Sequence, residues 1–140
     1  MNFLNAQQLN NDGMYVNAEG DLFNGKVSAV KEGVRSELEV KEGQLNGEAN
    51  YYYASGSKME SGQFKSGLKE DKWIRYSENG NISAIGFYLG GKKDGTWMVY
   101  DDKGNKRFEM NYNNGEKSGI WTNWDENGVV INTKSYSSAN

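Results

Sequence analysis

The stretch GTWMVYDDKGNKRFEMNYNNGEKS, residues 95–118, recurs along the chain at a spacing of 24 residues. It matches DKWIRYSENGNISAIGFYLGGKKD at 71–94 and GIWTNWDENGVVINTKSY at 119–136, while GEANYYYASGSKMESGQFKSGLKE at 47–70 keeps the same frame. Self-similarity at a fixed period is typical of repeat proteins, in which each unit buries its apolar face against its neighbours. The period therefore predicts a chain built from stacked units of equal size.

Five units follow from this frame, with a cap in front of them and a short tail behind. The first unit is two residues shorter than the next three and carries valine where they carry aromatic residues, which predicts looser packing there. In the cap, a degenerate hairpin is expected around Ala18-Glu19-Gly20, and Phe3, Leu4 and Leu9 are spaced as one face of a short helix. The predicted segments are a cap at 1–24, units at 25–46, 47–70, 71–94, 95–118 and 119–137, and a tail at 138–140.

The composition favours a thin sheet over a deep core. Of 140 residues only 36% are hydrophobic, and the mean hydropathy is -0.88. Eighteen glycines and no proline accompany nine tyrosines and four tryptophans. Such a composition indicates strands and turns whose apolar surface is largely aromatic. We therefore predict an all-β fold.

Each unit reads as two strands. In the fourth unit the strands are 96–100 and 105–112, joined by the turn Asp101-Asp102-Lys103-Gly104, in which the glycine is expected to have positive φ. The connection to the next unit reads as six residues with Gly115 at its centre. Both connections are too short for parallel crossovers. The sequence thus predicts an elongated, twisted, single-layer antiparallel meander of about ten strands.

The period places aromatic residues in three columns. The columns are Trp73, Trp97, Trp121; Tyr52, Tyr76, Tyr100, Trp124; and Phe64, Tyr88, Tyr112, Tyr136. We expect each column to form its own stack, with glycines or small residues on intervening strands letting the rings lean together. The Trp73 and Tyr52 columns are offset by three positions on their strands, so they should face opposite sides of the sheet. We interpret the rings mainly as the core of a thin sheet; the alternative is a platform for a sugar or a peptide.

Charged residues form columns too. Lys69, Lys93 and Lys117 share one column, expected in the longer connections, and Glu78, Asp102 and Glu126 share another in the tight turns. Because alternate turns of a meander lie on opposite edges, one edge should be rich in lysine and the other acidic. These edges serve either as solvated surfaces or as electrostatically steered docking sites.

Several classes of function are disfavoured. The sequence has no histidine and no cysteine, which removes Ser-His-Asp and Cys-His catalysis and thiolate metal sites. Neighbouring carboxylates such as Asp101-Asp102 lack the cleft of a glycosidase, and DDKGN lacks the ligand spacing of a calcium loop. We predict no catalytic, metal-binding or cofactor-binding residue, and no enzyme. A net charge of -3 gives no global attraction to nucleic acid, and no apolar run suits a membrane span or a signal peptide. The compartment stays open.

The recurring frame G-x-W-x-x-Y-x-x-x-G, followed by Y-x-x-G-x-x-x-G, resembles the bacterial variant of the MORN (membrane occupation and recognition nexus) repeat. The frame is carried by GTWMVYDDKG with YNNGEKSG, by DKWIRYSENG with YLGGKKDG, and by GIWTNWDENG, and more weakly by GEANYYYASG and GKVSAVKEG. Asp71 and Ala49 depart from it, replacing the expected glycine and tryptophan. The resemblance implies stacked hairpins used as a noncatalytic interaction surface. Proteins similar in this way include bacterial antitoxins and cell-envelope proteins, and related eukaryotic repeats contact membranes and phosphoinositides.

Two functional hypotheses follow. The first is a monomeric scaffold that binds a protein, in antitoxin-like fashion a toxin; its terminal strands leave edge-to-edge association open. The alternative is a surface module for a glycan or anionic lipid head groups. The candidate partner-binding residues are Lys69, Lys93, Lys117, Trp73, Trp97, Trp121, Trp124, Glu78, Asp102 and Glu126.

Overall fold

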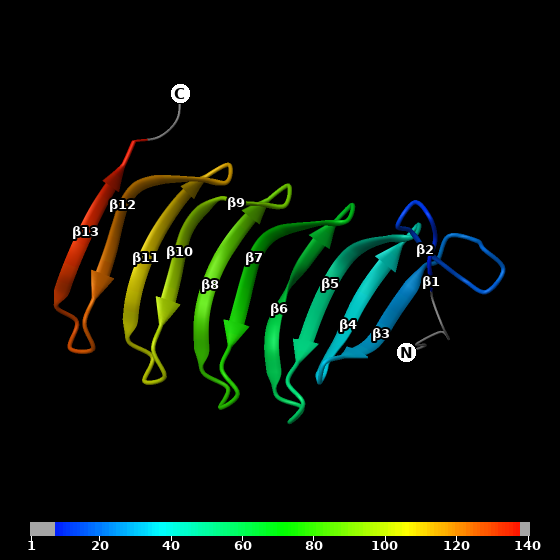
Figure 1. Cartoon of the computed structure of the whole chain (residues 1–140), viewed down its shortest axis with the longest axis horizontal. Coiled ribbons are helices and arrows are strands. Elements are labelled where there is room, and N and C mark those ends of the chain that lie inside the picture. The colour runs from blue at the N-terminus through cyan, green and yellow to red at the C-terminus, as the bar shows by residue number, and fades with distance from the viewer. Residues whose placement is uncertain (1–7, 138–140) are drawn as a thin grey trace.

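The computed structural model describes residues 8–137 and shows an open antiparallel sheet (Figure 1). The main sheet has 11 strands. They are β3 (Gly25–Lys31), β4 (Val34–Lys41), β5 (Gln44–Tyr52), β6 (Lys58–Lys65), β7 (Leu68–Tyr76), β8 (Ile82–Leu89), β9 (Lys92–Lys93), β10 (Gly95–Tyr100), β11 (Lys106–Asn113), β12 (Glu116–Trp124) and β13 (Val130–Tyr136). Ten of them lie side by side in chain order, and β9 pairs with β8 on the side where β10 also pairs with it. The predicted all-β meander of consecutive hairpins is confirmed.

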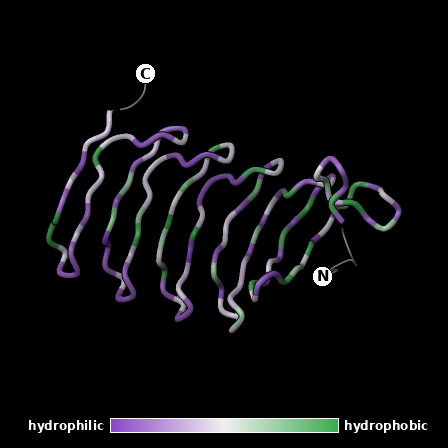
Figure 2. Tube along the Cα trace, in the orientation of Figure 1, coloured by the Kyte–Doolittle hydropathy of each residue, from purple (hydrophilic) through white to green (hydrophobic). Residues whose placement is uncertain are grey.

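Two kinds of connection alternate between the two long edges of the sheet. At the loop edge, lower in Figure 1, five-residue loops at 77–81, 101–105 and 125–129 join the strands. Their glycines have positive φ, as predicted: 92° at Gly80, 86° at Gly104 and 84° at Gly128. Figure 2 shows that the loops between β10 and β11 and between β12 and β13 are hydrophilic.

At the opposite edge, the turn edge, the connections are only two residues long. Asn114 and Gly115 have φ values of 50° and 91°, and Ser66-Gly67 and Gly90-Gly91 repeat this pair of positive angles. Two consecutive positive φ values define a type I′ turn, whose twist matches that of the flanking strands. The predicted six-residue connection is therefore wrong: the strands continue through it, because this turn needs only two residues.

The strands that follow these turns bend near the turn edge, as β5, β7 and β12 show in Figure 1. Opposite Gly62 the register jumps, so that Asp71, Lys72 and Trp73 face a single residue of β6. Each such bulge contains a residue with positive φ, which is 108° at Gly47, 64° at Asp71 and 64° at Gly119. Asp71 thus adopts, at the position where the frame expects glycine, a backbone conformation that L side chains rarely take.

Hydrogen bonds between successive units explain why the units stack at a fixed period. The N–H of Gly67 donates to the carbonyl of Leu45 at 2.8 Å. Gly91 repeats this bond with Lys69 at 2.9 Å, and Gly115 with Lys93 at 2.7 Å. Each turn is also held through its first residue, whose N–H donates to a side chain of the preceding unit: Ser66 to Asn46 at 3.1 Å, Gly90 to Glu70 at 2.9 Å and Asn114 to Asp94 at 2.9 Å.

The N-terminal segment folds against the first unit. Strands β1 (Gln8–Leu9) and β2 (Tyr15–Val16) form a small separate sheet, and Val16 bridges to Leu22 across Ala18-Glu19-Gly20. Because Leu9 lies in a strand, the expectation of a helical face there is wrong. Phe3, Leu4 and the tail at 138–140 lie outside the described residues.

The buried side chains gather in the first half of the sheet. One cluster joins Phe23, Val27 and Val40, and a second joins Leu38, Ala49 and Trp73. The first unit was expected to pack loosely because it lacks aromatic residues, yet it holds much of the core. Ala49, which replaces the expected tryptophan, is 0% exposed. The small side chain of Ala49 leaves no gap because Leu38, opposite it on β4, packs in the same cluster.

Candidate functional site

A continuous ladder of aromatic rings crosses one face of the main sheet. Trp73, Trp97 and Trp121 alternate with members of the Phe64 column, and consecutive rings meet mostly edge to face. The centroid distances are 5.2 Å for Phe64–Trp73, 6.2 Å for Trp73–Tyr88, 5.1 Å for Tyr88–Trp97, 6.0 Å for Trp97–Tyr112, 5.3 Å for Tyr112–Trp121 and 5.0 Å for Trp121–Tyr136. Two columns expected to stack separately therefore interleave into one aromatic ladder.

The backbone fixes each indole of the ladder in place. The indole N–H of Trp73 donates to the carbonyl of Gln63 at 3.1 Å, and Trp97 and Trp121 repeat this bond to the carbonyl ten residues earlier. The ring lies flat on the residue before that carbonyl. For Trp73 and Trp97 this residue is Gly62 or Gly86, where an added Cβ would stand 2.1 or 2.3 Å from ring atoms. The glycines thus remove the side chain that would otherwise hold the ring off the sheet.

The last rung differs because Met110 takes the place of that glycine. The interplanar angle of the ladder falls from 79° at Tyr88–Trp97 to 60° at Tyr112–Trp121 and 55° at Trp121–Tyr136. The smaller angles thus occur at the rung where methionine replaces the glycine, and Met110 and Trp121 line the same hollow.

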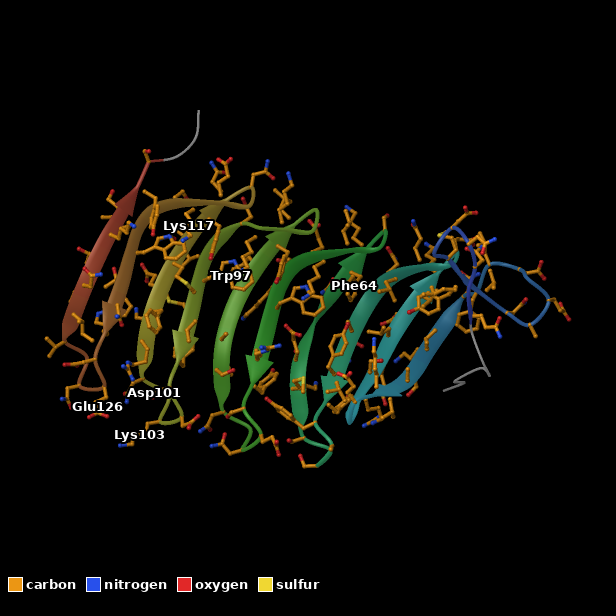
Figure 3. All side chains as sticks on the ribbon, viewed as in Figure 1. Phe64, Trp97, Asp101, Lys103, Lys117 and Glu126 are labelled. Carbon is orange, nitrogen blue, oxygen red and sulfur yellow. The ribbon has the colours of Figure 1, made fainter. Side chains whose placement is uncertain are left out.

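Each lysine of the predicted column lies over the ladder. Lys69 Nζ is 4.5 Å from the centroid of Trp73 and 5.1 Å from that of Tyr88. Lys93 and Lys117 repeat this placement, at 4.7 and 4.8 Å from the next two indoles. Such distances are those of cation–π contacts. The lysines therefore belong to the face of the sheet near the turn edge, as Figure 3 shows for Lys117, and the expected placement within the connections is wrong.

A groove follows the ladder across the strands. Its larger hollow, of about 360 Å³, has Ala84 and Gly86 on its floor and Trp73, Trp97 and Met110 among its walls. A second hollow, of about 190 Å³, also includes Met110 and continues to Trp121 and Tyr136. The two hollows thus adjoin at Met110, which lines both.

Charge in the groove is mainly positive. Lys69, Arg75 and Lys93 line the larger hollow together with a single carboxylate, Glu60, whose Oε1 is 4.0 Å from Arg75. Burial raises the pKa of the Tyr88 hydroxyl in the same hollow, and the Glu60 charge raises it further, so this hydroxyl is a neutral donor at ordinary pH. The groove therefore offers cations and a hydroxyl donor beside apolar rings.

The third predicted column does not form a stack. No ring pair involving Tyr52, Tyr76, Tyr100 or Trp124 occurs within residues 8–137. A cation lies over the first and the last ring of this column instead. Arg35 Cζ is 4.3 Å from the centroid of Tyr52, and Lys106 Nζ is 4.6 Å from that of Trp124. Trp124 is thus separated from the aromatic ladder that holds the other three tryptophans.

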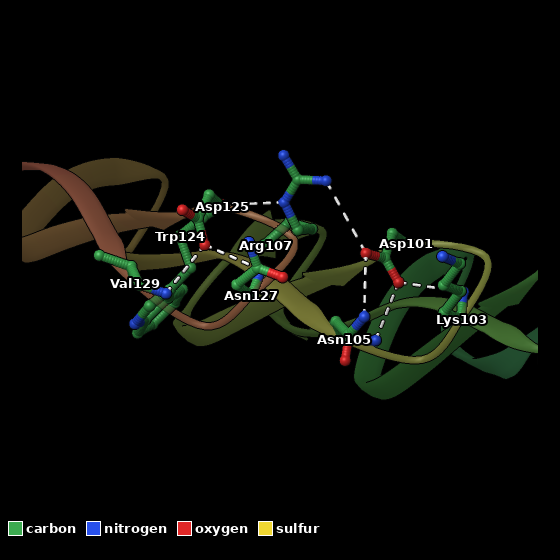
Figure 4. A network of polar contacts seen from close by, with 8 residues as sticks. All are labelled: Asp101, Lys103, Asn105, Arg107, Trp124, Asp125, Asn127 and Val129. Carbon is green, nitrogen blue, oxygen red and sulfur yellow. Dashed lines mark hydrogen bonds and ion pairs between the residues drawn. The ribbon is translucent and has the colours of Figure 1, made fainter.

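The loop edge is acidic, but the aspartate that opens each of two loops, Asp101 or Asp125, accepts hydrogen bonds from the backbone of its own loop (Figure 4). Asp101 Oδ1 accepts the backbone N–H of Lys103 at 3.0 Å and that of Asn105 at 2.9 Å. Asp125 repeats this pattern with the N–H groups of Asn127 and Val129. The bond from Asn105 lowers the pKa of the Asp101 carboxyl, helped by Lys103 and Arg107. Glu78, Asp102 and Glu126 are exposed in the same loops, and Figure 3 shows Glu126 at the opposite edge of the sheet from Lys117.

The turn edge is mixed in charge and does not match the lysine-rich edge that was expected. Lys65 and Lys92 are exposed there, but Glu42 and Glu116 lie in or beside the same set of turns. Glu70 and Asp94 hold turn N–H groups, as described above. The two edges are therefore not opposite in charge.

Two features that would indicate other kinds of function are absent from the described part of the chain. Residues 8–137 contain no group of three or more acidic, histidine or cysteine side chains placed to hold a metal ion. Over the same range no helix has the length and apolar character to cross a membrane.

Sequence reasoning found the rings and lysines of the groove but missed how they fit together. Gly62 and Gly86 lie 11 residues before Trp73 and Trp97, and this repeated offset could have predicted the flat indoles. No such signal marks Arg75 or Glu60, because the residues 24 positions before and after each of them are uncharged.

Two stretches of the chain, 93–114 and 117–137, match the MORN repeat variant. They correspond to the last two complete hairpins of the sheet. Repeats of this kind are generally noncatalytic modules for binding. No curated protein matches the chain at a significant level.

Proposed function

We propose that the protein is a non-enzymatic scaffold that binds another protein through the groove along its aromatic ladder. The observation that carries this proposal is the half-buried row of Trp97, Trp121 and Tyr112 beside a cationic groove. Tryptophan, tyrosine and methionine are enriched at protein interfaces, and tryptophan and tyrosine are prominent among the few residues that contribute most of the binding energy. A groove lined by such residues across several rigid strands suits a partner that lies across the repeats.

A glycan fits the groove less well. Sugars bind aromatic platforms by stacking on a free ring face. One face of Trp73 or Trp97 rests on a glycine, and a lysine ammonium lies over the ring. The indoles therefore have no open face on which a pyranose could stack, and the geometry favours a ligand that engages the lysines.

The antitoxin-like version of this proposal makes the partner a protein toxin that the scaffold sequesters. It rests on the resemblance of the repeat frame to that of such proteins. It requires a tight one-to-one complex whose formation suppresses the toxic activity. Coexpression of the chain with the product of a neighbouring gene would test this directly through cell survival.

The test of binding is affinity capture with the full chain from the cell in which it is made. The informative variant replaces Lys69, Lys93 and Lys117 with glutamate. A charge-matched control replaces Lys65, Lys72 and Lys103, which are exposed and make no contact with the ladder. We expect one protein to be retained by the wild type and the control and lost with the ladder variant.

Three results would contradict the proposal. One is recovery of no protein in repeated captures, and another is equal recovery with both variants. The third is retention of a lipid or glycan that persists after protease digestion of the lysate and depends on the ladder lysines, which would instead support the alternative module. Circular dichroism and thermal melts of both variants establish that each one is folded.

A further inference from the structure

We infer that the segment bound in this groove is an extended acidic peptide that crosses the strands and places a carboxylate at about every third residue. This inference rests on the proposed function and specifies the chemistry of the partner. It follows from the direction of the groove, its charge and the spacing of its lysines.

The groove runs across the strands, not along them. Its larger hollow is lined from Glu60 on β6 to Met110 on β11, and the smaller hollow continues from Met110 to Asn132 on β13. A ligand that fills both hollows must therefore be long and narrow, and must cross successive repeats in order. A peptide in extended form has this shape.

Positive charge accompanies the whole length of this path. Lys69, Arg75 and Lys93 line the first hollow, Lys134 lines the second, and Lys117 lies over Trp121 and Tyr136 in its wall. Two carboxylates line the same hollows. Glu60 faces Arg75, and Glu109 lies 3.8 Å from Lys106. In a chain whose net charge is -3, this local excess of cations selects an anionic ligand.

The lysines remain able to bind anions while they lie over the rings. A cation–π contact uses the charge of the ammonium but none of its three N–H donors. Lys117 is exposed, and Lys69 and Lys93 are half-buried. Each ammonium is thus held by the rings beneath it and can still donate hydrogen bonds to a carboxylate.

The repeat sets the distance between these cations. Equivalent residues of successive units are two strands apart, and strands are spaced by about 4.8 Å, so the lysines recur at about 10 Å. A polyproline II helix has three residues per turn, so side chains three residues apart lie on the same side of it, about 9 Å from one another. In this extended conformation, one carboxylate every third residue therefore meets each lysine in turn.

Other anionic partners fit these observations less well. A bilayer is flat, and a twisted sheet touches a flat surface over only part of the lysine row. A uronate-containing glycan carries charges at regular distances, but its sugar rings find no open indole face. A flexible peptide can follow the twist and needs no stacking surface.

The test uses two synthetic peptides of equal composition and the full-length chain. One consists of four copies of Glu-Pro-Ala, and the other places all of its glutamates in one block followed by the prolines and alanines. Tryptophan fluorescence and titration calorimetry at low salt measure the affinities. We expect the spaced peptide to bind at least about tenfold more tightly than the blocked one, and its binding to weaken as salt is added.

Variants connect this binding to the lysine column. Replacing Lys69, Lys93 and Lys117 with glutamine should weaken binding of the spaced peptide by at least about tenfold, whereas arginine at the same three positions should preserve it. Glutamine at Lys65, Lys72 and Lys103 should leave it unchanged. Melting temperatures of all three variants show whether a loss of binding comes from a loss of fold.

Four outcomes would overturn the inference. They are equal affinity for the two peptides, no saturable binding of either, binding that is insensitive to the ladder lysines, and preferential binding to phosphatidylserine vesicles or to polygalacturonate. A protein partner captured through the ladder lysines, together with no binding of the spaced peptide, would overturn the acidic-peptide inference alone and leave the proposed function standing.

Discussion

The two halves of the sheet are built from the same hairpins but are stabilised differently. In the packed region, residues 8–73, seven hydrophobic side chains are buried, and Phe23 and Trp73 are each 3% exposed. In the open region, residues 74–137, no hydrophobic side chain is buried to that extent. The ladder, the inter-unit hydrogen bonds and the hairpins nevertheless continue without a break.

The difference shows what the repeat supplies and what it does not. The repeat fixes the register, the turns and the positions of the rings in both regions. Burial depends on what covers the sheet, which in the packed region includes the N-terminal segment with Phe23 against Val27 and Val40. The open region keeps its rings half-exposed, and we attribute the binding groove to this exposure. Stability thus draws mainly on one end of the sheet and binding mainly on the other, and the two meet at Lys69 and Trp73, which also line the larger hollow.

The largest contrast is expected between two tryptophans of the same ladder. Trp73→Ala should lower the free energy of unfolding by about 4 kcal/mol, because it removes a buried ring from the second cluster. Trp121→Ala should lower it by about 2 kcal/mol, since that ring already contacts solvent. Urea denaturation followed by circular dichroism measures both values. Equal losses would show that burial does not differ between the regions in the way described.

The glycines beneath the indoles give the next contrast. Gly62→Ala places a Cβ 2.1 Å from Trp73, whose ring cannot move away, and we expect a loss of about 3 kcal/mol. Gly86→Ala creates a similar clash with Trp97, but this half-buried ring has room to move outward, so the loss should be nearer to about 1 kcal/mol. Gly104→Ala, in an open loop where φ is 86° and an added Cβ meets no atom within 4 Å, measures the cost of backbone strain without a clash. An effect of Gly62→Ala no larger than that of Gly104→Ala would contradict the close approach of ring and backbone.

The smallest contrast concerns the bulges. Asp71 has a φ of 64° where other units have glycine, so Asp71→Gly should stabilise the protein by roughly 0.5 kcal/mol. The reciprocal change Gly95→Asp should destabilise it by roughly 1 kcal/mol, because Gly95 has a φ of 87°. Thermal melts at matched pH measure both shifts. A destabilising Asp71→Gly would mean that the aspartate side chain contributes more than its backbone strain costs.

Much of this fold could be predicted from the sequence because the period carries it. The frame around Trp97 and Gly104 gave the hairpins, the loop-edge turns and the order of the strands. The strands on either side of Asn114-Gly115 extend further into this connection than predicted. A glycine in a two-residue turn looks the same in sequence as a glycine in a longer loop.

The site was predicted only in its parts. In the sequence, the column that contains Trp97 and the column that contains Tyr112 could form two separate stacks or one interleaved ladder. Which arrangement forms depends on the bulge at Gly95 and on the space above Gly86, and both are set by pairing between strands. The placement of Lys93 over the rings follows from the same geometry. The packed region was misjudged because Leu38 and Ala49 complement each other across strands, which a column of equivalent positions does not reveal.

The central claim is that a packed end anchors an open, ligand-binding end, and amide hydrogen exchange of the full chain tests it most directly. We predict the slowest exchange in β4, β5 and β7, where buried side chains cover the backbone, and progressively faster exchange through β11, β12 and β13. Uniform protection along the sheet, or slower exchange in β12 than in β5, would contradict the claim.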